Sequence, residues 1–281
     1  MIRSVACVLA LLCLPAMAAG QQRPLVTEDP ETVGSGNVLV EAGLEYGDDI
    51  EFPASGLKGD LWRVPLVGIS IGISSIAEVQ VDGGLYNHLS ITDRDPSAPL
   101  ADMLDITGDS TSDIQDFSIG LKVRLIKEGV YSPGWGVRFA TRLPNASNES
   151  GLGLDTTNFY WSVLGAKTIE RLRVVGNLGF AILGDPTRGD RQNDVLTYGV
   201  SFSRALTPSA EAVAEVNGHV DTRDGPPLPG SESRSVVRVG ARYTIGAWRA
   251  DGAVLFGLTE SDPGFGIAGG FTYVFKAFTI P

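Results

Sequence analysis

The chain has few of the side chains that most often carry chemistry. It contains only two cysteines and two histidines in 281 residues, and both cysteines, Cys7 and Cys13, lie within the first 20 residues. If those residues are an export signal that is removed, no cysteine remains for a disulfide, a thiolate metal site or a nucleophile. The sequence has no H-E-x-x-H, no Cys/His metal spacing, no phosphate-binding loop and no G-x-S-x-G. We therefore predict no metal site, no cofactor and no catalytic residues.

A strong positive charge is also lacking. The chain carries 22 Lys and Arg against 33 Asp and Glu, and Arg3 is the only charged residue before position 21. Nucleic acid is bound mainly through basic side chains on its phosphates, so we expect no nucleic-acid partner. Arg3, the apolar run 5–14 and the small residues at positions 16, 18 and 19 predict a cleaved secretory signal peptide over residues 1–20.

Beyond this signal no apolar run approaches the roughly 20 residues that a membrane-spanning helix needs. The sequence instead contains about twelve segments in which apolar and polar residues alternate, which is the period of a β-strand. We expect strands near 37–46, 60–73, 75–90, 114–127, 134–143, 157–167, 171–183, 194–205, 209–221, 233–245, 247–259 and 265–276. Strands cross a membrane only as a closed barrel, because every backbone polar group must be paired.

The connections between these segments are alternately short and long. Long connections are expected at 47–59, 91–113, 144–156, 184–193 and 222–232, with tight turns such as 73–75 and 168–171 between them. Outer-membrane barrels have this asymmetry, with short periplasmic turns and longer extracellular loops. In the segment 114–127, Ile119 and Leu121 share one face and Lys122 and Arg124 the other, as expected for apolar-out and polar-in strands. Pro65 predicts a β-bulge in the segment 60–73.

These patterns predict an all-β protein, a single antiparallel transmembrane β-barrel of about twelve strands. We assign residues 1–20 to the signal peptide, residues 21–36 to a periplasmic N-terminal segment and residues 37–281 to the barrel. The expected location is the outer membrane of a Gram-negative-type bacterium, with outer-membrane lipid, lipopolysaccharide and the barrel assembly machinery as partners.

Strand parity places charged side chains on the inward face. The predicted lumen-lining residues are Glu41, Arg63, Glu78, Asp82, Lys122, Arg124, Arg138, Arg142, Arg173, Glu211, Glu215, Arg238, Arg242, Arg249 and Asp251. Either these charges line a narrow pore and set its selectivity, or they form ion pairs that fill a lumen little wider than its side chains. The interior of a twelve-stranded barrel is intermediate in width between that of eight-stranded barrels, which side chains fill, and that of sixteen-stranded barrels, which hold an open channel. We favour a partly obstructed pore over a sealed one.

Two features suggest other chemistry. A hydrolase at the outer rim would need a partner beside one of the two histidines, for example Ser90 beside His88 or Asp221 near His219. The loop 91–113 is rich in aspartate, whose oxygens suit hard divalent cations, but it lacks the spacing of a calcium loop. We interpret the histidines as solvated or satisfied groups and the loop as a solvated acidic surface.

Two stretches resemble the outer-membrane transporter family named for the meta-pathway of phenol degradation. The first is RPLVTEDP at 23–30, followed by GSG at 34–36, and the second is WRVPLVGISIGI at 62–73, followed by Glu78 and Val79. The resemblance implies an outer-membrane β-barrel with a transport role, with aromatic or other small apolar compounds as the expected solutes. The C-terminal end departs from the usual barrel pattern, because the chain continues beyond the aromatic residue Phe275 to Pro281.

We therefore predict a channel or transporter for the passive passage of small solutes. A hydrolase acting at the extracellular rim and a structural or adhesive barrel without transport are the alternatives.

Overall fold

The computed structural model describes residues 23–279, so the predicted signal peptide with Cys7 and Cys13 lies outside the described residues. The described chain forms fourteen β-strands and one short 3-10 helix, η2 (Ala101–Met103). The strands are β1 (Asn37–Phe52), β2 (Leu57–Gly72), β3 (Ala77–Gly84), β4 (Asn87–Arg94), β5 (Ser110–Asp113), β6 (Ser118–Ile126), β7 (Gly134–Arg142), β8 (Asn158–Ile169), β9 (Leu172–Gly184), β10 (Gln192–Ala205), β11 (Ala210–Asp221), β12 (Arg234–Ile245), β13 (Trp248–Gly257) and β14 (Gly266–Lys276).

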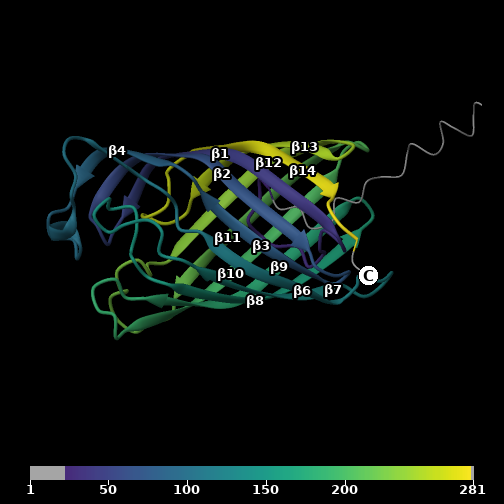
Figure 1. Cartoon of the computed structure of the whole chain (residues 1–281), viewed down its shortest axis with the longest axis horizontal. Coiled ribbons are helices and arrows are strands. Elements are labelled where there is room, and N and C mark those ends of the chain that lie inside the picture. The colour runs from purple at the N-terminus through teal and green to yellow at the C-terminus, as the bar shows by residue number, and fades with distance from the viewer. Residues whose placement is uncertain (1–22, 280–281) are drawn as a thin grey trace, which may run out of the picture.

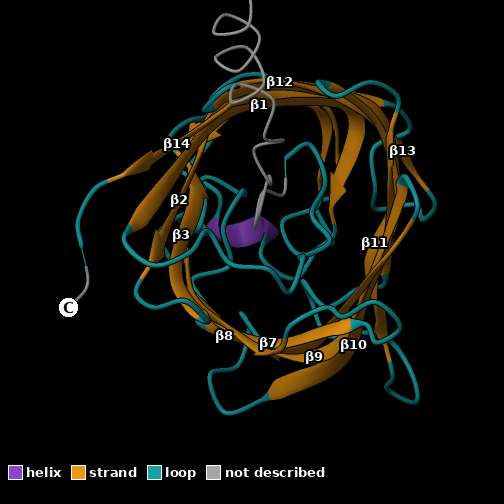
Figure 2. Ribbon diagram, turned by 90° about the vertical axis from the view of Figure 1, so that its right-hand side faces the viewer, coloured by secondary structure: helices purple, strands orange, loops and turns teal. Residues whose placement is uncertain are grey.

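All fourteen strands belong to one antiparallel sheet that closes on itself, because β1 pairs with both β14 and β2. Two positions of the wall are each occupied by two short strands, one beyond the other along the same line. β3 and β4 both pair with β2, whereas β6 pairs with β3 and β5 pairs with β4. The wall therefore has twelve positions, and the predicted twelve-stranded antiparallel barrel is confirmed (Figures 1 and 2).

The two rims of the barrel differ. One rim, which we call the turn end, carries the short connections at 73–76, 127–133, 170–171, 206–209 and 246–247, together with the start of β1 and the end of β14. The other rim, the loop end, carries the connections at 53–56, 95–109, 143–157, 185–191, 222–233 and 258–265. The prediction of a long connection over 47–59 was wrong, because β1 and β2 continue as a ribbon until only residues 53–56 remain between them.

The bulge predicted at Pro65 is present. Gly43 pairs with Leu66 and Glu45 pairs with Arg63, so β2 has two residues where β1 has one. Because of the extra residue, apolar side chains face outward both before and after the proline. Trp62 and Val64 are exposed before it, and Ile69 is exposed after it. Proline suits this position because it has no N–H to donate to a neighbouring strand.

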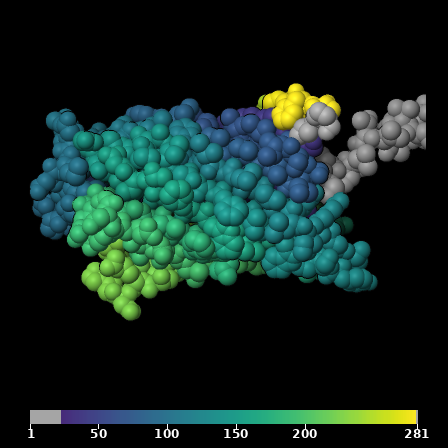
Figure 3. Space-filling model, turned by 60° about the horizontal axis from the view of Figure 1, so that its bottom comes forward, coloured from purple at the N-terminus to yellow at the C-terminus, as the bar shows by residue number. Residues whose placement is uncertain are grey.

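The outer surface is apolar along the middle of the strands. Its exposed side chains include Ile119, Leu121, Phe139, Leu178 and Phe180. Figure 3 shows one side of this wall, which residues from the middle of the chain cover in teal and green. The lysine and arginine side chains of the same strands occupy the alternate positions and lie inside the barrel, where they pair with carboxylates. Among residues 23–279 no helix is long and apolar enough to cross a membrane.

The loop end contains an apolar cluster on the side of β1, β2 and β4. Leu57, Leu61 and Leu89 are almost completely buried and pack with Ile50. Leu104, Ile106 and Leu152, from the 95–109 and 143–157 loops, pack against this cluster. The two loops also join through a hydrogen bond from the Asp105 amide to the Glu149 carbonyl, 3.0 Å. Apolar packing therefore fixes these loops over one side of the loop end.

Candidate functional site

The N-terminal residues 23–36, which we call the lumen segment, run inside the barrel at its turn end. The amides of Val26 and Thr27 donate to the Glu215 carboxylate of β11 at 2.9 Å, and the Val33 amide donates to Glu78 of β3 at 2.6 Å. These strands lie on different sides of the barrel, so the segment crosses its interior (Figure 2). The sequence pattern predicts a periplasmic segment over residues 21–36, whereas residues 23–36 lie within the lumen.

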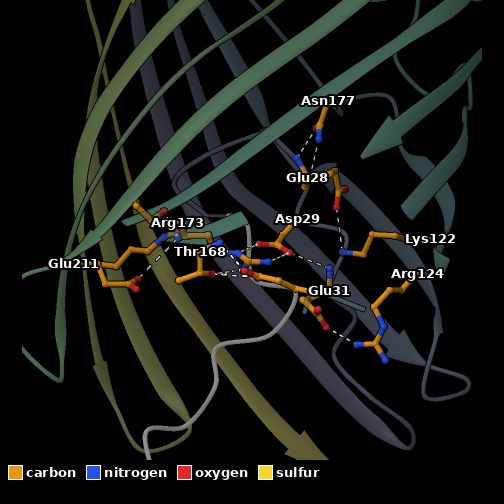
Figure 4. Close-up of polar contacts among 12 residues, drawn as sticks. Glu28, Asp29, Glu31, Lys122, Arg124, Thr168, Arg173, Asn177 and Glu211 are labelled. Atoms are coloured by element: carbon orange, nitrogen blue, oxygen red, sulfur yellow. Dashed lines mark hydrogen bonds and ion pairs between the residues drawn. The ribbon is translucent and has the colours of Figure 1, made fainter. Parts of the chain in front are cut away.

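Ion pairs explain why the segment stays inside. Glu28 Oε2 lies 3.3 Å from Lys122 Nζ, and Glu28 Oε1 lies 2.9 Å from Arg138 Nε. Asp29 accepts two hydrogen bonds from Arg173, one of them 2.7 Å long. Glu31 pairs with Arg124 (Figure 4). An isolated charge is costly to enclose, so three acidic residues of the segment and four basic residues of the wall stabilise each other.

Glycines on the inner wall make space for the segment. The guanidinium group of Arg23 lies where a side chain at Gly43 would begin. A Cβ atom at Gly199 would lie 2.8 Å from the Thr27 hydroxyl oxygen. With Arg23 and Thr27 in place, a larger residue at either position would collide with their side chains, so the inner wall and the segment have complementary shapes.

Most of the other predicted lumen charges also have partners. Lys122 Nζ lies 2.9 Å from Glu78, and both side chains are fully buried. The remaining contacts are Arg63 with Glu45 (2.5 Å), Arg238 with Glu215 (3.2 Å) and Glu45 (3.5 Å), Asp82 with Arg138 (3.7 Å), Asp251 with Arg23 (3.5 Å), Glu211 with Arg242 (4.0 Å), and Glu41 with Arg249 (4.0 Å). Arg142 instead lies over the ring of Tyr160, 5.1 Å from its centroid. The structure thus brings all fifteen predicted residues to the interior; that they line a solute path stays a prediction.

Two cavities lie beside the lumen segment. The larger has a volume of about 410 Å³ and is lined by Arg23, Glu28, Glu41, Asp82, Arg142 and other residues. The smaller, about 230 Å³, is bordered by uncharged polar side chains that include Ser162, Asn177, Thr197, Asn217 and His219. Val26, Glu28, Arg138 and Tyr160 contribute to both cavities. The lumen is therefore obstructed at the turn end but not filled.

The acidic residues of the lumen segment are not among the predicted lumen residues, although the sequence contains a signal for them. The inward basic residues Lys122, Arg124, Arg138 and Arg173 come from neighbouring strands without an equal number of acids among them. Three acids at 28, 29 and 31 precede the first strand. An unbalanced basic wall and an acidic segment beside it in the chain together indicate that the segment folds inward.

Neither histidine contacts the partner that the hydrolase alternative required. His88 Nδ1 lies 2.7 Å from the Ser112 hydroxyl, not beside Ser90, and its ring is stacked near Tyr86. His219 Nε2 lies 2.8 Å from the Glu232 carbonyl oxygen, whereas Asp221 accepts a hydrogen bond from Asn193. A catalytic triad also needs a carboxylate that orients the histidine ring. Among the described residues, no carboxylate hydrogen-bonds to His88 beside its contact with Ser112.

Within residues 23–279, the aspartates of the acidic loop form no group of three or more ligands that could hold a metal ion. Asp95 accepts hydrogen bonds from the Ser97 amide and hydroxyl, and Asp113 accepts one from the Ser147 amide at 2.8 Å. Hydrogen bonds from Ser97 hold the pKa of the Asp95 carboxyl below its usual value. These carboxylates therefore stabilise local loop structure at separate places.

Glu128 links the β6–β7 turn to the anchoring of the segment. It binds the Thr168 amide at 2.7 Å, Lys167 at 3.0 Å and Arg173 at 2.9 Å, and Arg173 holds Asp29. Burial acts to raise the pKa of Glu128, but these hydrogen bonds outweigh it and lower the pKa to about 2. The folded state thus stabilises the ionised carboxylate of Glu128 more than the unfolded state does.

We expect Glu128→Gln to lower the free energy of unfolding at pH 7 by about 1 to 2 kcal/mol, allowing for the solvent-exposed part of the site. Because the folded pKa is depressed, the stabilisation is present above the ordinary value of 4.5 and is lost as the pH falls towards 2. Denaturant unfolding of both proteins at a series of pH values measures this. A stability difference that persists unchanged at pH 2 would contradict the assignment.

The closed wall, the apolar outer surface and the polar interior together define a transmembrane β-barrel that resembles those of outer membranes. A family model described as "Putative MetA-pathway of phenol degradation" matches residues 21–275, and the chain belongs to this family. The resemblance seen in the sequence is thereby confirmed.

The chain is similar to solved structures of outer-membrane proteins. An outer-membrane channel from Pseudomonas putida F1 is 12% identical and superposes with a TM-score of 0.63, covering 88% of this chain and 98% of that one. The translocator domain of the autotransporter NalP from Neisseria meningitidis is 14% identical, with a TM-score of 0.47 over 85% of this chain and 88% of that one. No curated protein sequence matches the chain.

Proposed function

We propose that the protein is a passive channel of the outer membrane for small solutes, with its loop end outside and its turn end facing the periplasm. The observation that carries this proposal is the space that remains beside the lumen segment, about 410 Å³ and 230 Å³ in two adjacent cavities. A barrel that served only as a scaffold or an anchor would need no such space. The membership of the chain in its family and the fold shared with an outer-membrane channel support the proposal.

The path that we propose follows the two cavities. Tyr160, which borders both, lies between the charged wall near Asp82 and the uncharged wall near Thr197 and Asn217. A solute on this path meets hydrogen-bonding groups on one side and paired charges on the other. Small compounds with a flat, partly apolar body suit cavities of this size and lining, so aromatic compounds are the solutes we propose.

Filling the smaller cavity is expected to reduce transport. Thr197 lines that cavity, whereas its neighbour Leu196 is exposed on the outer face. Thr197→Trp should lower the rate of liposome swelling in small sugars to less than about half, because the indole occupies the proposed path. Leu196→Trp, the matched control, should leave the rate unchanged. Intact protein that supports neither swelling nor current in planar bilayers would overturn the proposed function.

A further inference from the structure

Arg142 differs from the other basic residues of the lumen. Lys122, Arg124, Arg138 and Arg173 each lie against a carboxylate of the lumen segment or of the wall. Within residues 23–279 no carboxylate lies within ion-pair distance of Arg142; its contact is the face of Tyr160. Its side chain is exposed to the lumen, at the end of β7 nearer the loop end. Arg142 is therefore a positive charge held in place by a ring and left without a counter-ion.

The acids around the same cavity already have partners. Glu28 is shared by Lys122 and Arg138. Glu41 accepts a hydrogen bond from Thr272, and Asp116 accepts two from the backbone amides of residues 145 and 146. Asp82 lies 3.7 Å from Arg138. Of the three arginines that line the larger cavity, Arg142 is thus the one with no ion pair among the described residues, since Arg23 pairs with Asp251 and Arg138 with Glu28.

We propose that Arg142 and Tyr160 form a binding site for a small organic carboxylate that carries a flat ring. This inference rests on the proposed function, since the ligand must enter the lumen. The guanidinium group can donate two parallel hydrogen bonds to a carboxylate, and the edge of the Tyr160 ring, one face of which Arg142 covers, can pack edge-to-face with the ring of the ligand. The cavity volume of about 410 Å³ lies within the range of small-molecule sites, about 300 to 1,000 Å³. The site makes the channel selective for aromatic acids over neutral aromatic compounds.

Calorimetric binding to the intact protein in detergent micelles tests the inference with benzoate, benzyl alcohol and acetate as probes. Benzoate should bind better than either of the others, because only benzoate offers both a carboxylate and a ring. Arg142→Gln should weaken benzoate binding by about tenfold and leave benzyl alcohol unchanged, as expected for the loss of a charge-assisted hydrogen bond. Tyr160→Leu should weaken the binding of benzoate more than that of acetate. Arg188→Gln, in an exposed loop, is the matched control and should change nothing.

Several results would overturn the inference. Benzoate that binds no better than acetate would remove the role of the ring, and equal binding to the intact protein and to Arg142→Gln would remove the role of the guanidinium. Heat-modifiable migration in gels shows that each variant is folded. Liposome swelling separates the two proposals: sugar flux without benzoate binding overturns this site alone, whereas benzoate binding without any flux retains the site and overturns the channel.

Discussion

A chain that lacks residues 23–33 will conduct ions several-fold better in planar bilayers than the intact protein, and with a greater preference for anions. The lumen segment occupies the turn end of the barrel, where its acids face the basic wall. Its removal frees the space that the segment occupies in the lumen. It also leaves Arg124 without Glu31 and leaves Arg173 with Glu128 as its remaining acidic partner, and the added positive charge of the pore favours anions.

A substitution tests the same idea without shortening the chain. The triple variant Glu28→Gln, Asp29→Asn, Glu31→Gln removes the ion pairs that hold the segment while keeping its length. Its conductance should lie between those of the intact and the shortened proteins, because the segment then leaves its position for part of the time. Single-channel recording would show this as added transitions to a larger open level.

A disulfide provides the matched control for that variant. A Cβ atom at Gly199 would lie 3.5 Å from the Cβ of Thr27, at the short end of the range that a disulfide spans, about 3.5 to 4.5 Å. Adding Thr27→Cys and Gly199→Cys to the triple variant should return the conductance to the level of the intact protein under oxidising conditions. Reduction should raise it again. If the oxidised and reduced forms conduct equally, the current does not pass where the segment lies.

Lys122→Met is expected to destabilise the barrel by about 3 to 5 kcal/mol. Lys122 is fully buried between Glu78, at 2.9 Å, and Glu28, at 3.3 Å. Arg138 still neutralises Glu28 in the variant, but Glu78 keeps only neutral donors, the Val33 amide and the Gln80 side chain. The methionine side chain thus leaves one carboxylate enclosed without a cation. Denaturant unfolding followed by tryptophan fluorescence measures the loss.

Two further variants decide whether the enclosed carboxylate causes this loss. Lys122→Met with Glu78→Gln should recover most of the stability, since the uncompensated charge is then gone. Lys58→Met makes the same chemical change at the loop end, where Lys58 pairs with Asp49 and Glu51 in contact with solvent, and should change stability little. A single Lys122 variant as stable as the intact protein would show that water enters the lumen and replaces the lysine.

Much of the barrel follows from local pattern. The alternation in β6, where Ile119 and Leu121 are exposed and Lys122 is buried, requires one apolar and one polar face, and the bulge follows from a proline in a paired strand. The extension of β1 and β2 beyond the predicted 47–59 loop could not be predicted in this way. That ribbon is stabilised by Ile50 and Leu57 packing against loops that lie far along the chain.

The sequence by itself determined the number of strand positions in the wall, the two faces and the set of inward charges, because a period of two residues assigns each side chain to one face of a strand. Only the tertiary structure decided how those charges are used. Closing the sheet brings Lys122, Arg138 and Arg173 around one enclosed space, where an acidic segment is bound because enclosed charge must be neutralised. Arg142 has no such counter-ion among the described residues, and only the positions of the surrounding carboxylates in the folded barrel distinguish it from the other inward basic residues.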